Sequence, residues 1–182
     1  MARSSSIILF CILGLILSLI LTAWLIPGGL ELKITLVKED KVLFALPLKP
    51  AERFTIHYYH SVENAPIWEE HCLDKRGAIY IEEERYQKFG AGMGKMPGVG
   101  TMVKEGIYET IQDMHMPVGN FILRVGSPGV DHTIIWRDKR FNLSDIIPHK
   151  AVKFSGEPVS MLYNLCRFFN FAACWQKVFS KH

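Results

Sequence analysis

The sequence lacks a Cys-x-x-Cys pair, and its four cysteines have no spacing typical of a metal site. Cys11 lies within a long apolar run, which leaves Cys72, Cys166 and Cys174 for redox chemistry. On a helix, Cys166 and Cys174 would lie about 12 Å apart along the axis, which exceeds the separation that a disulfide tolerates. Cys72 could pair with one of them, or all three could be free thiols.

Acidic residues are absent from both ends of the chain, before Glu31 and after Glu157. The segment between these two residues contains all 18 Asp and Glu and all but four of the 21 Lys and Arg. The excess of positive charge therefore lies at the ends of the chain. We expect no nucleic-acid partner, because that would require Lys and Arg clustered on the folded domain.

Charge is also absent from residues 7–26, an apolar run of 20 residues. A helix of this length matches the roughly 30 Å hydrocarbon core of a bilayer. A cleaved signal peptide would have an apolar region of about 7–15 residues and then a small-x-small site, and residues 22–27 contain no such site. The sequence favours an uncleaved membrane anchor over residues 1–27, with a signal sequence as the alternative.

The charges that flank this span favour neither orientation, because Arg3 precedes it while Lys33, Lys38 and Lys41 follow it. Long domains after a first span translocate largely regardless of their charge. We therefore expect a single-pass protein of the plasma (inner) membrane, with the amino terminus inside and the domain on the extracytoplasmic, periplasmic side.

The remaining chain, about 150 residues, is enough for one domain. Its short apolar segments, separated by turn signals, predict strands rather than long helices. We predict an all-β sandwich or barrel-like domain over residues 30–156. The expected strands cover residues 32–36, 42–46, 54–59, 67–73, 78–86, 106–111, 120–125, 133–136 and 151–154.

The tail, residues 158–182, has a different pattern. On a helical projection its apolar side chains share one face and its polar and basic side chains the opposite face. We predict a C-terminal amphipathic helix. Such a helix either lies in the lipid headgroup region or packs against the β domain as a surface helix.

The most specific pattern consists of His60-Ser-Val-Glu63, Pro66-x-x-Glu69 and Phe89-Gly-Ala-Gly92. Together these motifs resemble the bacterial family called domain of unknown function 1850 (DUF1850), over roughly residues 40–155. Asp131-His132 before a short strand is similar to a later part of that family. The resemblance implies a small membrane-anchored protein whose gene lies beside those of TRAP-type transporters of the TAXI class, which import organic acids with an extracytoplasmic binding protein. It implies no established activity.

One interpretation of these residues is hydrolase chemistry. His60, Ser61 and Glu63 have the residue types of a nucleophile and its base, and Glu69 or His132 could complete a triad by tertiary approach. Adjacent residues on a strand point to opposite faces, so His60 and Ser61 can meet only where the chain turns. Ser61 also lacks a surrounding Gly-x-Ser-x-Gly motif.

A second interpretation is a metal site. His57, His60, Glu63, Glu69 and His71 offer nitrogen and oxygen donors suited to a divalent ion. Glu69 and His71 share one face of their predicted strand, which is the better geometry. The alternative is that His57 and His71 are strand residues facing solvent.

A third interpretation is a polar site without chemistry. Histidine and carboxylate side chains beneath a glycine-rich loop, predicted over residues 89–106, could bind a small molecule or fix a loop that contacts a partner. The loop has neither the dinucleotide-binding nor the P-loop glycine spacing. The alternative is that His60 and Glu63 only hold their turn by hydrogen bonds. The charge run at residues 82–85 is interpreted as solvated surface.

The favoured function is a non-enzymatic accessory or binding subunit of a TRAP-type (TAXI) transporter, with the membrane and a permease or its binding protein as partners. No catalytic residue, metal or cofactor is assigned. The alternative is an envelope hydrolase or metal-binding enzyme that uses His60 with Glu63 or Glu69. The predicted ligand-binding or partner-binding residues are His60, Ser61, Glu63, Glu69, Gly90, Gly92 and Gly94.

Overall fold

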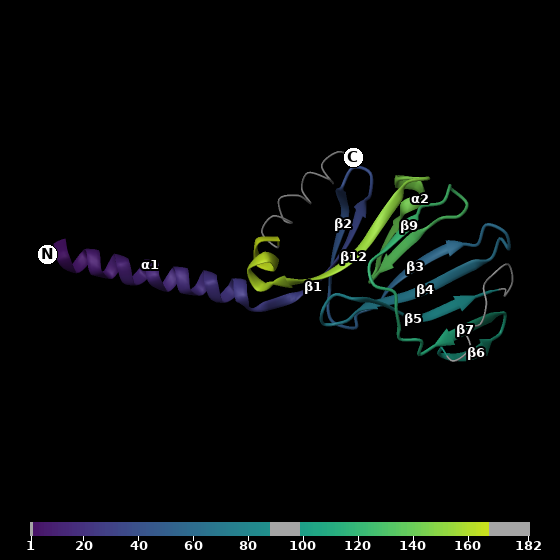
Figure 1. The fold of residues 1–182 in the computed structure, drawn as a ribbon, viewed down its shortest axis with the longest axis horizontal. Helices are drawn as coiled ribbons and strands as arrows, with labels where there is room; N and C mark the ends of the chain where they lie inside the picture. Colours follow the sequence, from purple (N-terminus) through teal and green to yellow (C-terminus); the bar gives the residue numbers. More distant parts are fainter. Residues whose placement is uncertain (1, 88–98, 168–182) are drawn as a thin grey trace. The chain divides into compact units, whose positions relative to one another are not determined.

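The computed structural model describes residues 2–87 and 99–167, with side chains from residue 8 onward. The chain divides into two compact units, one formed by residues 1–29 and 158–182 and the other by residues 30–157. The first unit contains an apolar N-terminal helix, and the second contains the β domain (Figure 1).

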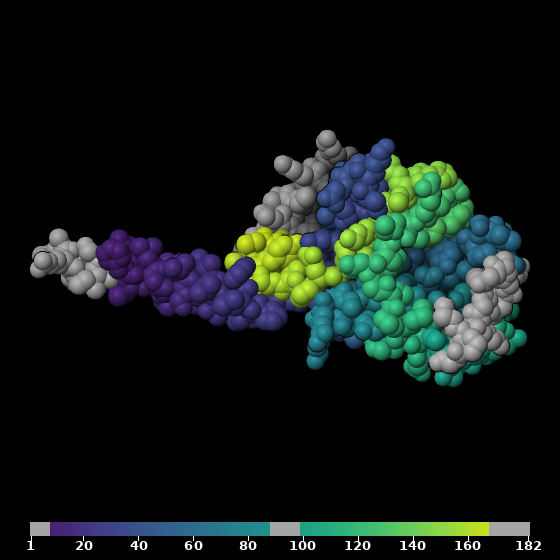
Figure 2. Space-filling view, viewed as in Figure 1, coloured from purple at the N-terminus to yellow at the C-terminus, as the bar shows by residue number. Residues whose placement is uncertain are grey.

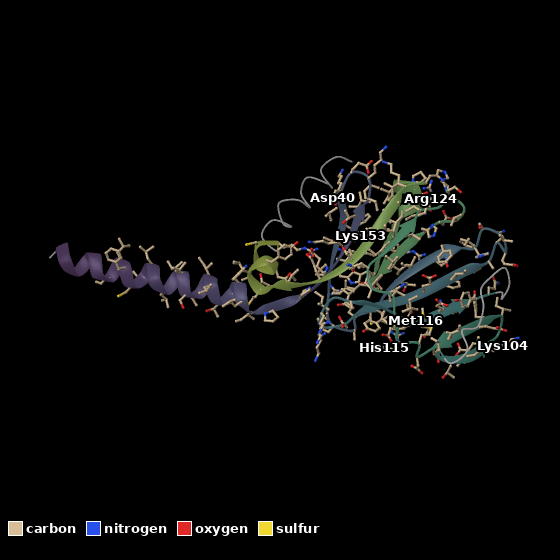
Figure 3. All side chains as sticks on the ribbon, viewed as in Figure 1. Asp40, Lys104, His115, Met116, Arg124 and Lys153 are labelled. Atoms are coloured by element: carbon tan, nitrogen blue, oxygen red, sulfur yellow. The ribbon has the colours of Figure 1, made fainter. Side chains whose placement is uncertain are left out.

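The N-terminal helix α1 (Ala2–Leu25) includes an 18-residue segment, Ile8–Leu25, with a mean hydropathy of 2.7. None of this segment is buried, and its side chains project on all sides of the helix (Figure 3). A helix that is apolar all round is buried in a large core or spans a membrane. The chain therefore has one N-terminal helix that could span a membrane, as predicted, and the side on which the domain lies stays a prediction.

The predicted C-terminal helix begins within the same unit, since residues 161–167 are helical. The amide of Met161 donates to the carbonyl of Ile26 at 2.9 Å, and Asn164 Nδ2 donates to the carbonyl of Gly28 at 2.6 Å. A Cβ on Gly28 would lie 2.5 Å from the Ser160 carbonyl oxygen, so this approach requires glycine. Residues 168–182 lie outside the described ranges, and the amphipathic character of the whole segment stays a prediction.

The β domain contains two sheets, which confirms the prediction of a β-rich fold. The first sheet has the strand order β2-β1-β12-β9, so strands from opposite ends of the sequence are neighbours (Figure 2). The second has the order β11-β10-β3-β4-β5-β7-β6, and β8 pairs with β5. The strands of the first sheet are β1 (Pro27–Leu36), β2 (Lys41–Leu48), β9 (Phe121–Arg124) and β12 (Ala151–Ser160). Those of the second are β3 (Phe54–Tyr59), β4 (Pro66–Leu73), β5 (Ile79–Tyr86), β6 (Thr101–Glu105), β7 (Tyr108–Gln112), β8 (Met116–Pro117), β10 (Thr133–Trp136) and β11 (Lys139–Asn142).

The main hydrophobic core receives side chains from both sheets. Leu32 and Ile34 of the first sheet and Phe54, Ile56 and Ile134 of the second are at most 2 % exposed. Full burial of one such side chain contributes about 1.5–3 kcal/mol, so this shared core holds the two sheets together. A second, smaller cluster lies over β5 and β7 and contains Ile67, Ile81, Tyr86, Ile111 and Met114.

A register shift in β5 decides which residues of that strand face inward. Glu69 and Glu70 pair with Glu84 and Glu83, whereas the next residue, His71, pairs with Ile81. Glu82 is therefore an extra residue, and this β-bulge interrupts the period of two along the strand. As a result Ile81 and Glu84, three positions apart, both lie on the inner face.

The predicted strands at residues 54–59 and 133–136 are confirmed as β3 and β10. The loop predicted to reach residue 106 is wrong at its end, because Thr101–Glu105 forms β6 and turns into β7 at Gly106, whose φ is +63°. Strand β12 runs six residues beyond its predicted end at residue 154. The short helix α2 (Leu143–Ile146), capped by the Asn142 side chain, was not predicted.

Candidate functional site

His60, Ser61 and Glu63 form the turn that joins β3 to β4. The amide of His60 donates to the Ala65 carbonyl, and the amide of Asn64 donates to the His60 carbonyl, both at 2.9 Å. The amide of Glu63 donates to His60 Nδ1 at 3.3 Å, so the imidazole stabilises the turn. Side-chain acceptors of this kind commonly replace backbone acceptors in turns. The structure thus gives the predicted motif a clear structural role.

Glu69 lies apart from that turn, on the inner face of β4. Its cross-strand partner is Glu84 of β5, so two carboxylates stand directly opposite each other. Directly opposite Cβ atoms are about 4.5–5.5 Å apart, and like charges at this separation destabilise a sheet. No Lys or Arg of the described ranges forms an ion pair with either carboxylate. An unusual acidic pair therefore lies at the inner surface of the second sheet.

Two tyrosines donate hydrogen bonds to these carboxylates. The Tyr58 hydroxyl donates to Glu69 Oε1 at 2.8 Å, and the Tyr86 hydroxyl donates to Glu84 Oε2. The ring of Tyr58 stacks on the ring of His132, with the ring centroids 5.1 Å apart, and this contact holds Tyr58 in place. The pair of hydroxyls stabilises negative charge on each carboxylate.

His71 lies next to Glu69 on the same strand face and is almost completely buried, with 2 % of its side chain exposed. Its ring stacks between Phe54 and Phe121, with centroid separations of 5.3 and 5.8 Å. Nδ1 lies 3.1 Å from the Glu69 carbonyl oxygen, so it carries the proton and donates there. Nε2 then presents a lone pair, at 3.9 Å from Glu69 Oε2. Tyr58, Glu69, His71, Glu84 and Tyr86 are called the Glu69 cluster below.

The protonation states of the cluster follow from its burial. Burial raises the pKa of Glu84 to about 7, helped by the charge of Glu69. Burial also raises the pKa of Glu69, which the Tyr58 hydrogen bond partly offsets. Burial lowers the pKa of His71 to about 4, so this imidazole is neutral at physiological pH. Burial and the charge of Glu69 raise the pKa of Tyr58, which stays a hydrogen-bond donor.

Comparison with protein families gives a match for the segment that contains both the turn and the Glu69 cluster. Residues 54–143 match the model of a family described as domain of unknown function (DUF1850). These matched residues, 54–143, are called the DUF1850 segment below. Comparisons with curated proteins and with solved structures gave no match.

Three of the predicted site residues share the β3–β4 turn of the DUF1850 segment, and Glu69 belongs to the cluster at the sheet surface. Ser61 is exposed, and among the described residues no hydrogen bond links its hydroxyl to a histidine. Gly90, Gly92 and Gly94 lie outside the described ranges.

Two interpretations of the DUF1850 segment are wrong. His57 and His71 do not face solvent, since the first is 8 % exposed and the second 1 %. His57 packs on the ring of Trp68, and His71 packs on two phenylalanines. The charge run at residues 82–85 is not simply solvated surface, because the β-bulge turns Glu84 inward. Neither the raised pKa of Glu84 nor the hydrogen bond that Tyr86 donates to it was predicted, because a run of three glutamates does not indicate which of them is buried.

A second group of polar side chains in the DUF1850 segment lies around Glu82. Its Oε1 accepts from the thiol of Cys72 at 3.0 Å and lies 2.8 Å from His115 Nδ1. Burial raises the pKa of the Cys72 thiol to about 12, so it is a poor nucleophile. Figure 3 places His115 beside β5. Within residues 2–87 and 99–167, no three His, Cys, Asp or Glu side chains are arranged to hold a metal ion.

Proposed function

We propose that this protein is a membrane-anchored, non-enzymatic accessory or binding subunit of a TRAP-type (TAXI) transporter. The observation that carries the binding role is the Glu69 cluster, which concentrates hydrogen-bonding groups on an inner sheet surface. These groups are held in place by stacking and hydrogen bonds. Such preorganised polar groups beside apolar side chains are typical of ligand sites.

The transporter assignment is supported by the DUF1850 segment and by the genes that accompany members of that family. The apolar helix α1 supports a location at the membrane, where a permease would also lie. Placing the β domain outside the cytoplasm puts the cluster where an extracytoplasmic binding protein delivers its cargo.

The enzymatic alternative has less support from the geometry. A hydrolase needs a nucleophile within hydrogen-bond reach of its base. Ser61 is exposed on the turn, and His60 Nδ1 already accepts the Glu63 amide. Glu69 lies on β4, apart from the turn that contains His60. Its described partners are Tyr58 and His71.

The experiment that tests the accessory role is mass spectrometry of proteins that co-purify with the tagged full-length chain from gently solubilised native membranes. We expect a TRAP-type permease or its binding protein, in reduced yield when Glu63→Ala removes the carboxylate from the β3–β4 turn and keeps the backbone amide that donates to His60. Glu105→Ala, on β6, is the control. Recovery of no transporter component after mild crosslinking would overturn the assignment.

A further inference from the structure

The face of the second sheet that is turned away from the core carries a row of aromatic and basic side chains. Ile56 of β3 belongs to the core, so its neighbour His57 lies on the opposite face of the sheet. His57 stands opposite Trp68 of β4, and Trp68 stands opposite Arg85 of β5, so the three side chains share that face. The name Trp68 face is used below for these residues and the two tyrosines that contact them: His57, Tyr59, Trp68, Arg85 and Tyr108.

The rings of the Trp68 face pack against one another. Trp68 lies between His57 and Arg85, with the His57 ring centroid 4.9 Å from its own and Arg85 Cζ 4.5 Å above its ring. The edge of a second ring, Tyr108, lies 5.7 Å from Trp68. A nucleobase or a sugar ring binds an indole by stacking on a free ring face. Because Trp68 is contacted on both sides, this surface is poorly suited to such ligands.

Arg85 presents its N–H groups without a carboxylate partner. Its side chain is exposed, and it forms no ion pair with any carboxylate of residues 8–87 and 99–167. Its guanidinium is held over Trp68 and lies 5.6 Å from the ring centroid of Tyr108. A guanidinium stacked in this way is preorganised, and its fork of N–H donors matches a carboxylate. Arg85 is therefore ready to pair with a carboxylate of another molecule.

Arg140 adds a second cation at the other end of the row. It stands opposite Ile135 of β10, which in turn stands opposite Thr55 of β3, so Arg140 lies on the same face of the sheet as His57. Arg140 is exposed, and the described part of the chain offers it no ion pair either. Four strand spacings separate it from Arg85, which corresponds to about 19 Å.

The titration of His57 reflects the positive potential along this row. Burial lowers the pKa of His57, and the charges of Arg140 and Arg85 lower it further, while Asp131 opposes them. His57 is thus a neutral ring between two cations. The surface is complementary to a molecule that carries negative charge.

The residue types indicate what kind of molecule this is. Trp, Tyr and Arg are the residues most enriched at the energetic centres of protein interfaces. Small-molecule sites are concave and enclose most of their ligand, whereas the Trp68 face extends over neighbouring strands, with Arg85 and Tyr108 at one end and His57 further along. A protein surface can contact the whole row at once.

We propose that the Trp68 face, together with Arg140, is a docking surface for an acidic segment of a partner protein, whose carboxylates pair with Arg85 and Arg140. This inference goes beyond the transporter role and does not depend on it, because it assigns a second surface on the opposite side of the sheet from the Glu69 cluster.

The test uses a fluorescein-labelled peptide of 20 glutamates and the full-length protein in micelles of an uncharged detergent at pH 7.5 and 50 mM salt. About six extended residues span the distance between the two arginines, so this peptide can reach both. We expect a saturable rise in fluorescence anisotropy with a Kd in the range of 10–100 µM. A peptide of 20 lysines should not bind.

Matched variants connect the signal with the surface. Arg85→Gln and Arg140→Gln should each raise the Kd at least threefold, and the double variant at least tenfold. Arg85→Lys keeps the charge and loses the planar fork, so it should also raise the Kd at least threefold. Arg124→Gln is the control, because it removes the same charge from an exposed arginine on β9 of the first sheet. It should leave the Kd unchanged.

Three results would overturn the proposal. The first is no saturable change in anisotropy up to 1 mM protein. The second is an equal effect of Arg124→Gln and Arg85→Gln, which would show attraction by net charge only. The third is tighter binding of polygalacturonate, a polysaccharide that also carries carboxylates, with the same dependence on Arg85 and Arg140. That result would assign the surface to an acidic polysaccharide instead of a protein.

Discussion

Replacing Glu84 by glutamine should stabilise the β domain, and more so at higher pH. The folded pKa of Glu84 is about 7, whereas an ordinary glutamate ionises near 4.5. Because the folded pKa is raised, the folded state binds more protons than the unfolded state between these values. The stability contributed by protonated Glu84 is fully present below pH 4.5 and is lost as the pH rises through 7.

The magnitude follows from the difference between the two pKa values. One pKa unit corresponds to about 1.4 kcal/mol, which sets an upper bound of about 3 kcal/mol for the loss above pH 7. Part of the Glu84 side chain faces solvent, which screens the interaction and reduces the expected effect to about 1–2 kcal/mol. Glutamine has the same shape and no charge, so it should recover this free energy.

The assay is urea unfolding of the full-length protein in mild detergent, followed by tryptophan fluorescence at pH 4.5 and pH 8. Glu84→Gln should raise the free energy of unfolding by about 1–2 kcal/mol at pH 8 and leave it nearly unchanged at pH 4.5. Glu105→Gln serves as the matched control, because Glu105 is exposed. A variant no more stable than the wild type at pH 8 would refute the burial of this carboxylate.

Three further predictions concern other parts of the β domain. Burial lowers the folded pKa of His71 from 6.5 to about 4, so the free energy of unfolding of the wild type should fall by up to about 3 kcal/mol as the pH drops between these values. His71→Gln should lack this loss in urea unfolding. The same dependence of the free energy on pH in the variant would contradict the prediction. A Cβ on Gly156 would lie 2.2 Å from a backbone oxygen, so Gly156→Ala should lower the free energy of unfolding by about 3 kcal/mol or more. Gly106→Ala should lower it by about 1 kcal/mol, because only the positive φ opposes the side chain there. Equal melting temperatures of the two variants would refute the close contact at Gly156. Cys72 is 4 % exposed, and burial raises the pKa of its thiol to about 12. Maleimide at pH 7.5 should therefore label the exposed Cys166 in minutes and Cys72 only in denaturant. Equal labelling of the two, measured by peptide mass spectrometry, would contradict this.

Most of the strands could be predicted from the sequence because their apolar residues alternate. In the predicted strand over residues 54–59, Phe54 and Ile56 alternate with polar residues, and both are buried in the core. The turn at His60 was also foreseen as one alternative, since its residues lie between two strand-like segments. Alternation was a sufficient guide wherever the strands are regular.

The candidate site could be predicted only in part, for reasons found in particular residues. Glu69 was singled out by its motif, but its partner Glu84 lies in a run of three glutamates that resembles an exposed strand end. Only the bulge at Glu82 turns Glu84 inward, and a bulge leaves no reliable mark in a single sequence. A solvent-facing His71 was the alternative to a metal site, and it is wrong because tertiary stacking on Phe54 and Phe121 buries the ring.

Because of the bulge at Glu82, the single strand β5 places glutamate side chains in different surroundings on the two faces of the sheet. Glu82 accepts from the Cys72 thiol on one side, while Glu84, two residues later, faces Glu69 on the other. Loss of a single residue from this run would shift the frame of the strand and exchange the two environments. The length of β5, as much as its composition, is therefore under constraint, and an insertion or deletion there should be more damaging than a substitution.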